Sequence, residues 1–394
     1  MADFETVDVL IVGSGPAGTS TALHLIKQDP AWAGRITIVD KAVHPREKLC
    51  GGGITHMGQN ILANLGLPLE PLNFEVKEAR LLYRNNSYSF FGNPVFRIVR
   101  RDEFDHWLVQ TTEKLGVPVR QGEAVTAVTP HGDYIEVVTT KAIFHARVLV
   151  AADGSRSFVR RKLKWDDDSR VARLVEVLTP EDATVQPEFR EGLAIFDFTP
   201  MDEDLQGYYW DFPSFIKGKP FMNRGVFDSR AVPQKPKADL KGVLSTEMAT
   251  RDRDLDDYQL KGHPIRWWST GGRFSQPRVL LAGDAAGVDP LFGEGISFAL
   301  GYGEPASETI IDAFARQDFS FDTYAGRLKK HRLFRHLRLR TWAAHYAYWL
   351  NYPNVVRVGW SIMRLVMRFT PWKHRDYVPG RMPEFRLTDM TPQS

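Results

Sequence analysis

The chain has 394 residues, of which 43% are hydrophobic and 25% charged, so it can bury a large core and is long enough for roughly two domains of about 150 residues each. Its formal net charge is only +3, which gives no general basicity, and we predict no nucleic-acid partner. The single cysteine, Cys50, excludes an internal disulfide and any zinc site built on several thiolates, and we predict no metal site.

The N-terminal segment and the spread of apolar residues bear on location. Residues 1–10 carry acids where a signal peptide would carry cations, and their short apolar run is typical of a strand. No uninterrupted run of about eighteen apolar residues occurs, so we expect no membrane-spanning helix. A lone cysteine is typical of a reducing compartment. We therefore expect a cytoplasmic protein that is soluble or lies peripherally on a membrane surface.

The first predicted elements are a buried strand, a glycine turn and a helix, which follow one another from Val7 to Leu25. In such a turn Gly13 lets the strand turn tightly, Gly15 lets the backbone approach a pyrophosphate, and Gly18 lets the helix pack on the sheet. The pyrophosphate would lie at the helix N-terminus. This pattern predicts a dinucleotide-binding unit, with cofactor contacts from Gly13, Ser14, Gly15, Pro16, Ala17 and Gly18.

The second predicted strand, at 35–42, ends in Asp40 and is followed by Lys41. Asp40 lies about 20 residues past the last glycine of the turn, where a ribose-binding acid is expected. A glycine-rich loop at 47–58 follows, and then a helix-like segment at 59–67. We predict Asp40 and Lys41 to be cofactor contacts.

The middle of the chain alternates between helix and strand patterns. Residues 101–115 place apolar side chains at helical spacing, and the segment 146–155 is a buried strand that ends in Asp153 and Gly154. From about 174 to 268 the pattern is mostly short, aromatic-rich strands, which indicates a separate β-rich domain. Residues 278–300 repeat the strand, turn and helix order of the N-terminus, so the nucleotide-binding domain is predicted to be discontinuous.

Three glycine and acid motifs in order, GSGPAG, ADGSRS and AGDAAG, look like a flavoprotein of the aromatic-hydroxylase fold. Three further strings resemble the geranylgeranyl reductase family: KLCGGGI from Lys48 to Ile54, YYWDFP from Tyr208 to Pro213, and DPLFGEGI from Asp289 to Ile296. The chain is thus similar to FAD-dependent oxidoreductases over most of its length. One departure is Asp40, where this family often has glutamate, and we expect the shorter side chain still to reach the ribose.

The resemblance implies a fold class of α/β plus α+β. We predict a discontinuous Rossmann-like FAD-binding domain at 1–75, 100–165 and 275–303, a β-sheet substrate domain at 76–99 and 166–274, and a C-terminal helical region at 304–394. It also implies further FAD contacts, from Cys50, Gly51, Gly52, Arg101, Ala124, Val125, Asp153, Gly154, Gly283, Asp284, Gly293, Gly295 and Ile296. The alternatives are that Asp284 only caps a helix and that Arg101 is an ordinary surface arginine.

Catalytic roles are predicted for Cys50, Tyr208 and Trp210. Cys50 precedes three glycines in a loop that lies close to the flavin in the resembling family, although a free cysteine is often just a small buried hydrophobe. Tyr208, Trp210 and Phe212 alternate along a strand, so they face one side and could wall an apolar cavity, to which Phe90 and Phe91 could contribute. The alternative is an aromatic core stripe.

The C-terminal third interleaves arginine and lysine with Trp342, Trp349, Trp360 and Trp372. Basic, aromatic amphipathic helices suit an anionic membrane interface, and a solvated basic face explains the pattern equally well.

The resemblance implies FAD-dependent reduction of carbon-carbon double bonds in an isoprenoid chain of a lipid, quinone or pigment precursor. The electron donor would be NAD(P)H or a ferredoxin-like protein, and candidate proton donors are Tyr208, Tyr209, His56 and Cys50. The alternative is an FAD-dependent monooxygenase or a halogenase acting on an aromatic or polycyclic substrate. Halogenases of this fold carry a Trp-x-Trp-x-Ile-Pro string, which this sequence lacks. A flavoprotein without turnover is a third reading.

Overall fold

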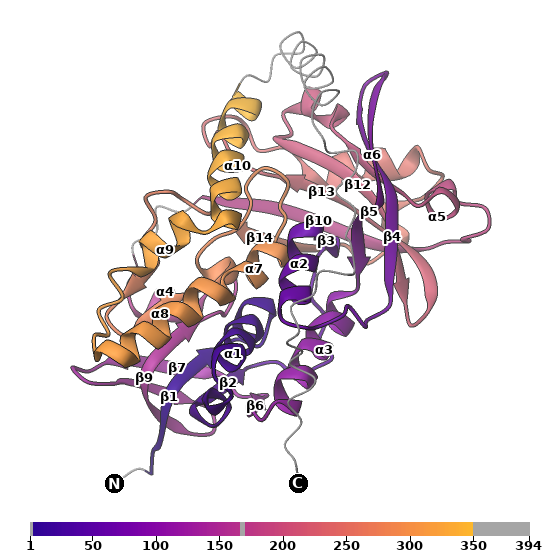
Figure 1. Cartoon of the computed structure of the whole chain (residues 1–394). Helices are drawn as coiled ribbons and strands as arrows, with labels where there is room; N and C mark the ends of the chain where they lie inside the picture. The colour runs from indigo at the N-terminus through magenta and orange to yellow at the C-terminus, as the bar shows by residue number, and fades with distance from the viewer. Residues whose placement is uncertain (1–2, 166–169, 350–394) are drawn as a thin grey trace.

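The computed structural model describes residues 3–165 and 170–349, which form two eight-stranded sheets with helices packed around them (Figure 1). The strands of the first sheet are β1 (Glu5–Val12), β2 (Ile36–Asp40), β6 (Val119–Gln121), β7 (Val125–Pro130), β8 (Ile135–Thr139), β9 (Ile143–Ala151), β15 (Ser275–Gln276) and β16 (Val279–Leu281). Those of the second are β3 (Gly53–Thr55), β4 (Asn73–Tyr83), β5 (Asn86–Val99), β10 (Val171–Pro180), β11 (Leu193–Asp197), β12 (Gly207–Ile216), β13 (Lys219–Asp228) and β14 (Lys261–Arg266).

The helices connect and cover these sheets. They are α1 (Pro16–Gln28), α2 (His56–Asn64), α3 (Arg101–Lys114), α4 (Phe158–Lys162), α5 (Pro187–Glu191), α6 (Leu240–Ala249), α7 (Ile296–Gly301), α8 (Gly303–Arg316), α9 (Tyr324–Lys330) and α10 (Arg332–Trp349). Short 3-10 segments lie at Pro30–Arg35, Thr199–Glu203, Leu255–Asp257 and Gly283–Ala285. None of the helices in the described part of the chain is long and apolar enough to cross a bilayer.

The first sheet has a parallel centre, with the strand order β15-β16-β9-β1-β2-β6. β1 pairs in parallel with both β2 and β9, and α1 makes the crossover from β1 to β2. The apolar run from Val9 to Val12 is buried on both faces, as expected for a central strand of a parallel sheet. This is the predicted Rossmann-like arrangement, and the chain returns to it at β16, as the sequence predicted.

The second sheet has the order β14-β10-β13-β12-β11-β4-β5-β3 and is antiparallel except where β11 runs parallel to β4. α6 packs against one face of it, over β13 and β10, and forms a small core of its own with Tyr209 and Val226. The opposite face carries Tyr208 and Trp210, because successive residues of a strand point to opposite sides. β12 thus presents different side chains to the two faces of its sheet.

Two details differ from the predicted segments. β3 pairs with β5 and so belongs to the second sheet, although residues 1–75 were predicted to belong wholly to the nucleotide-binding domain. β4 begins at Asn73, slightly before the predicted start of the substrate domain at 76. The physical reason is that the glycine-rich loop carries the chain across to the second sheet before α2. The other domain boundaries stay a prediction.

The C-terminal helices α8, α9 and α10 lie along one side of the molecule, and α10 reaches the second sheet (Figure 1). α8 packs on α1, and α9 packs on both α8 and α10. The predicted C-terminal helical region is confirmed by these three helices, and its predicted boundary at 304 stays a prediction. Trp360 and Trp372, which belong to the predicted basic and aromatic stretch, lie outside the described residues.

Candidate active site

A cavity of about 1650 Å³ lies between the two sheets and brings together the segments that the sequence singled out. It is lined by the glycine turn after β1, the ends of β2 and β9, the loop before β3, the turn after β16, and the inner face of β12. Of the predicted cofactor contacts, only Ser14, Gly18 and Gly283 do not line it. Residues from distant parts of the chain therefore share one cavity.

The turn between β1 and α1 is built for close backbone approach. Gly13 has a φ of +106°, and a Cβ there would lie 2.4 Å from the carbonyl oxygen of Ala152. Only glycine fits this position without strain. α1 then begins at Pro16, and its first turn carries no acid that would oppose an anion. The helix start faces the cavity, as a pyrophosphate site requires.

Asp40 ties the glycine turn to the end of β2. Its carboxylate accepts hydrogen bonds from the Ser14 backbone N–H and the Ser14 hydroxyl, both 2.7 Å long, and from the Ala42 N–H at 2.9 Å. Burial opposes ionisation, but the hydrogen bonds from Ala42 and Ser14 outweigh it and hold the pKa of Asp40 below its usual value. Asp40 is therefore an ionised acceptor that lines the cavity near the turn.

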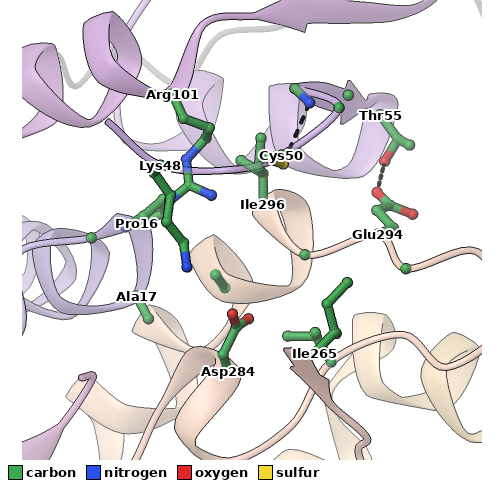
Figure 2. A pocket seen from close by; sticks show the side chains of 18 of the residues that line it. Pro16, Ala17, Lys48, Cys50, Thr55, Arg101, Ile265, Asp284, Glu294 and Ile296 are labelled. Carbon is green, nitrogen blue, oxygen red and sulfur yellow. Dashed lines mark hydrogen bonds between the residues drawn. The ribbon is translucent and has the colours of Figure 1, made fainter. Parts of the chain in front are cut away.

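Three cations gather on the cavity wall: Arg46, Lys48 and Arg101. Arg101 makes two 2.8 Å hydrogen bonds to the carboxylate of Asp105, which also pairs with Arg46 at 3.1 Å. Figure 2 shows the Lys48 and Arg101 side chains reaching into the space near Asp284. Arg46 was not predicted to be a cofactor contact, and Lys48 was considered only as a neighbour of Cys50. The signal for both is their position just before the three glycines at 51–53.

Lys48 is held by a histidine from the second sheet. Its Nζ lies 2.6 Å from Nε2 of His263, on β14. Burial, with Lys48 and other nearby cations, lowers the pKa of His263 to about 3, so the imidazole is neutral and accepts the lysine N–H. Burial also lowers the pKa of Lys48 to about 8. The cavity wall formed by Arg46, Lys48 and Arg101 is thus cationic at neutral pH, which fits the diphosphate of a dinucleotide.

Two carboxylates offer acceptor atoms to a bound ligand. Asp284 is half-buried in the turn after β16 and makes no hydrogen bond with any residue of the described ranges. Asp153 caps α4, since Oδ2 accepts the N–H groups of Phe158 at 2.6 Å and Val159 at 3.1 Å, while its buried Oδ1 has no partner among the described residues. Ligand hydroxyls would satisfy both groups. Ala124, another predicted cofactor contact, differs because both of its backbone polar groups already have partners. Its N–H donates to the Thr140 hydroxyl, and its carbonyl accepts the Thr140 N–H.

The segment from Asp289 to Ile296 is held from several sides. Asp289 is fully buried and accepts hydrogen bonds from the Leu291 N–H at 2.9 Å and from Arg340 of α10 at 2.7 Å. Arg340 also bonds to Glu294 at 2.6 Å, and the other oxygen of Glu294 accepts the Thr55 hydroxyl (Figure 2). This clamp from α10 was not predicted from the sequence.

The glycine-rich loop before β3 is fixed to the second sheet around Cys50. The Cys50 N–H donates to Glu176 at 3.2 Å, and the Cys50 carbonyl accepts from the Asn223 amide at 3.1 Å. Burial raises the pKa of Glu176 to about 7. The Cys50 sulfur accepts the N–H of Gly52 at 3.4 Å, and Cys50 lines the cavity (Figure 2).

Tyr208, Trp210 and Phe212 of β12 all line the cavity. The Tyr208 hydroxyl donates to the Phe292 carbonyl at 2.5 Å, and the Trp210 indole N–H donates to Asn223 at 2.8 Å. Both polar tips are satisfied within the protein, so the wall that faces the cavity is apolar. Tyr209 points to the opposite face, bonds to Asp211 at 2.6 Å and does not line the cavity. Its predicted role as a proton donor is wrong, because strand alternation turns it away.

A family model described as an FAD binding domain matches residues 6–300 of the chain. Among curated proteins, menaquinone reductase of Mycobacterium tuberculosis is 28% identical over 352 residues, covering 78% of this chain and 77% of the relative. Digeranylgeranylglycerophospholipid reductase 2 of Methanosphaera stadtmanae is 27% identical over 331 residues, covering 79% and 80%. These names confirm the predicted resemblance to geranylgeranyl reductases.

Solved structures share the fold. A geranylgeranyl bacteriochlorophyll reductase-like protein from Thermoplasma acidophilum superposes with a TM-score of 0.73 at 23% identity, over 88% of this chain and 89% of the other. The p-nitrophenol 4-monooxygenase PnpA from Pseudomonas putida gives 0.70 at 18% identity, over 95% and 100%. The glycine turn, the cationic wall and the two open carboxylates fit FAD, and the predicted cofactor is confirmed. The chain therefore belongs to the FAD-binding domain family and is an FAD-dependent oxidoreductase that is similar to geranylgeranyl reductases.

Proposed function

We propose that this protein reduces carbon-carbon double bonds in the isoprenoid chain of a lipid, quinone or pigment precursor. The observation that carries the proposal is the apolar wall of β12, which lies between the Cys50 loop and the segment from Asp289 to Ile296. Around it the cavity is lined by Leu81, Leu174, Phe196, Phe212, Phe227 and Ile265. An apolar cavity beside a flavin suits a hydrocarbon chain.

Bound FAD supplies a hydride when it is reduced, and the alkene must also receive a proton. An isolated alkene offers no carbonyl to polarise, so the protein contributes orientation, a dry cavity and a proton donor. Burial raises the pKa of Tyr208 well above its usual value, and its hydroxyl proton is already bonded to Phe292, which argues against Tyr208 as the donor. Cys50 and His56 line the cavity and are the better candidates.

For Tyr208 and Trp210 we propose a positioning role. Their rings shape the wall against which the chain lies, and the Tyr208 hydroxyl fixes the segment that carries Phe292 and Gly293. Gly293 has a φ of +69°, and a Cβ there would lie 2.9 Å from the Phe227 ring, so the segment rests directly on β13. The apolar wall of β12 and the segment from Asp289 to Ile296 are thereby held against each other.

The electron donor we propose is NAD(P)H or a ferredoxin-like protein, as the family resemblance implies. We also propose peripheral contact with a membrane surface. The exposed face of α10 carries Leu339, Trp342, Tyr346 and Trp349, with Arg335 and Arg338 also exposed on the same helix. Aromatic and basic side chains on one exposed helix suit an anionic interface. Cosedimentation with vesicles containing anionic lipid tests this contact.

The function is tested by incubating the purified, FAD-loaded protein with prenyl lipids and dithionite under anaerobic conditions, followed by mass spectrometry. The proposal predicts a gain of two hydrogens for each double bond reduced, without oxygen. A gain of oxygen or halogen only in air would instead establish the monooxygenase or halogenase class, whose fold the chain shares. Dithionite with free FAD and no protein is the control.

A further inference from the structure

Beyond the aromatic wall the cavity continues between two helices, α2 and α10. Three polar side chains of α2, at His56, Asn60 and Asn64, line it at intervals of four residues. Three basic side chains of α10 line it at the same interval, namely Arg332, His336 and Arg340. Residues four apart lie on one face of a helix. Each helix therefore turns a polar stripe toward the same space.

The floor of this groove is apolar. It is lined by Met57 and Ile61 of α2, Ile296 and Ala299 of α7, and Leu333 of α10. A Cβ on Gly301 would lie 1.9 Å from Leu333 and 3.6 Å from Ile61, so the end of α7 sits directly beneath both helices. A ligand in the groove would meet hydrocarbon below and polar groups on either side, which is the environment of an amphipathic molecule.

The groove joins the aromatic part of the cavity at its inner end and is exposed at its outer end. At the inner end, Glu294 bridges Thr55, which precedes α2, and Arg340 of α10. At the outer end Asn64 is exposed, and Arg332 is exposed at the start of α10. From His56 to Asn64 the α-helical rise spans about 12 Å. The groove is therefore a passage from solvent to the buried part of the cavity.

Hydrogen-bond donors predominate at the outer end. The Arg332 guanidinium and the Asn64 side chain form no hydrogen bond or ion pair with any residue in the described ranges. The nearby carboxylate, Glu304, is already bonded to His331 at 3.1 Å. Asn60 lies 3.1 Å from His56, which leaves its second amide N–H for a ligand. A ligand group that only accepts hydrogen bonds would complement this end.

We propose that the groove between α2 and α10 binds the phosphate or diphosphate head of a prenyl ester, with the chain lying on the apolar floor and its tail reaching the aromatic wall. Arginine and amide donors match phosphate oxygens, and an arginine can bind them through two hydrogen bonds. This inference rests on the proposed function, because it assigns the head of the same substrate. It also predicts that chains too short to cross the groove bind without being reduced.

The test is a binding measurement that needs no turnover. Phytanyl phosphate, whose chain is saturated, is compared with phytanol by following the change in flavin absorbance of the oxidised holoprotein. We expect the phosphate to bind at least about tenfold more tightly, as one charge-assisted contact would provide. Substituting both Arg332→Ala and Asn64→Ala should abolish that preference. Arg335→Ala, on an exposed part of α10 outside the cavity, is the matched control and should leave it unchanged.

Equal binding of phosphate and alcohol by the unaltered protein would overturn the inference, and so would a preference that survives the double substitution. The assignment to phosphate esters would also be overturned if binding of a prenylquinone depended on Arg332 as strongly as binding of the phosphate does. The proposed function fails separately, if unsaturated chains are never reduced. A phosphate preference in a protein without reductase activity would leave the groove assigned and the reaction wrong.

Discussion

Gly13 stands where β1 turns into α1, and its conformation is the one on which the cofactor site most directly depends. Its φ of +106° is unfavourable for any residue with a Cβ, and a Cβ would collide with the Ala152 carbonyl. We expect Gly13→Ala to lower the affinity for FAD at least about tenfold, because the turn must move away from the pyrophosphate position. FAD content after purification, read from the flavin absorbance, measures this.

Gly34→Ala provides the control, since a Cβ on Gly34 would meet nothing within 4 Å. Normal flavin content in Gly13→Ala would show that the turn tolerates a side chain and would contradict the assigned role.

Lys48 should make FAD binding sensitive to pH. Its pKa of about 8 means that the ammonium is charged below that pH and neutral above it. If the charge faces the diphosphate, the affinity for FAD falls as pH rises from 7 to 9. Lys48→Met should bind FAD more weakly at pH 7 and show a smaller change over that range. Fluorescence titration of apoprotein with FAD at each pH provides the measurement.

Lys114→Met is the matched control, because Lys114 is exposed at the end of α3 and outside the cavity. An unchanged pH dependence in Lys48→Met would place the titrating group elsewhere.

Glu176 should make folding stability depend on pH. Burial raises its pKa from 4.5 to about 7 in the folded state, so between these values the folded protein binds the proton more strongly than the unfolded chain. The contribution of Glu176 to the free energy of unfolding is therefore fully present below pH 4.5 and is lost as pH rises through 7. Compared with Glu176→Gln, the unaltered protein should lose up to about 3 kcal/mol of unfolding free energy over this window.

Urea unfolding at pH 5 and pH 8 measures this difference, with exposed Glu191→Gln as the control. A constant difference between the protein and Glu176→Gln at the two pH values would show that Glu176 does not titrate there.

At the scale of elements, α10 holds the segment from Asp289 to Ile296 through one arginine. Arg340→Met would leave two buried carboxylates, Asp289 and Glu294, without their cation. Breaking a buried ion pair typically costs about 3 to 5 kcal/mol. We expect a comparable loss of unfolding free energy, and slower flavin reoxidation by substrate because the segment beside the flavin loses its support. Denaturant unfolding and single-turnover kinetics measure the two effects.

Arg338→Met, on an exposed part of the same helix, is the comparison. Adding Asp289→Asn and Glu294→Gln to Arg340→Met should recover part of the stability, since the unpaired charges are then removed. No recovery would indicate that Arg340 acts through packing on Phe298 rather than through charge.

Elements with local signals could be predicted from the sequence. Each of these signals is formed by residues close together in the sequence, namely the turn at Gly13, the buried strand β1 and the aromatic alternation of β12. The Rossmann-like sheet and the apolar wall were therefore predicted. The contacts made by Arg340 and Glu176 could not be predicted, because their partners are distant in the sequence. Arg340 lies 51 residues from Asp289, and Glu176 lies 126 residues from Cys50. No local pattern of arginine or glutamate specifies which distant group it meets.

At the scale of the whole molecule, one cavity joins the cofactor turn of the first sheet to the aromatic wall of the second. The carboxylates of Asp153 and Asp284 and the cationic wall fit FAD, and the apolar wall beside them suits the hydrocarbon chain of the proposed substrate. The proposed double-bond reduction requires the flavin held by the first region to reach the substrate held by the second. Its central claim is therefore that a prenyl chain, and not oxygen, takes the electrons of the reduced flavin.

The most direct test is a single-turnover experiment in an anaerobic stopped-flow instrument. The holoprotein is reduced with one equivalent of dithionite and mixed with geranylgeranyl diphosphate. We expect the absorbance of oxidised flavin near 450 nm to return without oxygen, with one double bond saturated for each flavin reoxidised. Flavin that stays reduced with every prenyl lipid offered, and reoxidises only when air is admitted, would contradict the account.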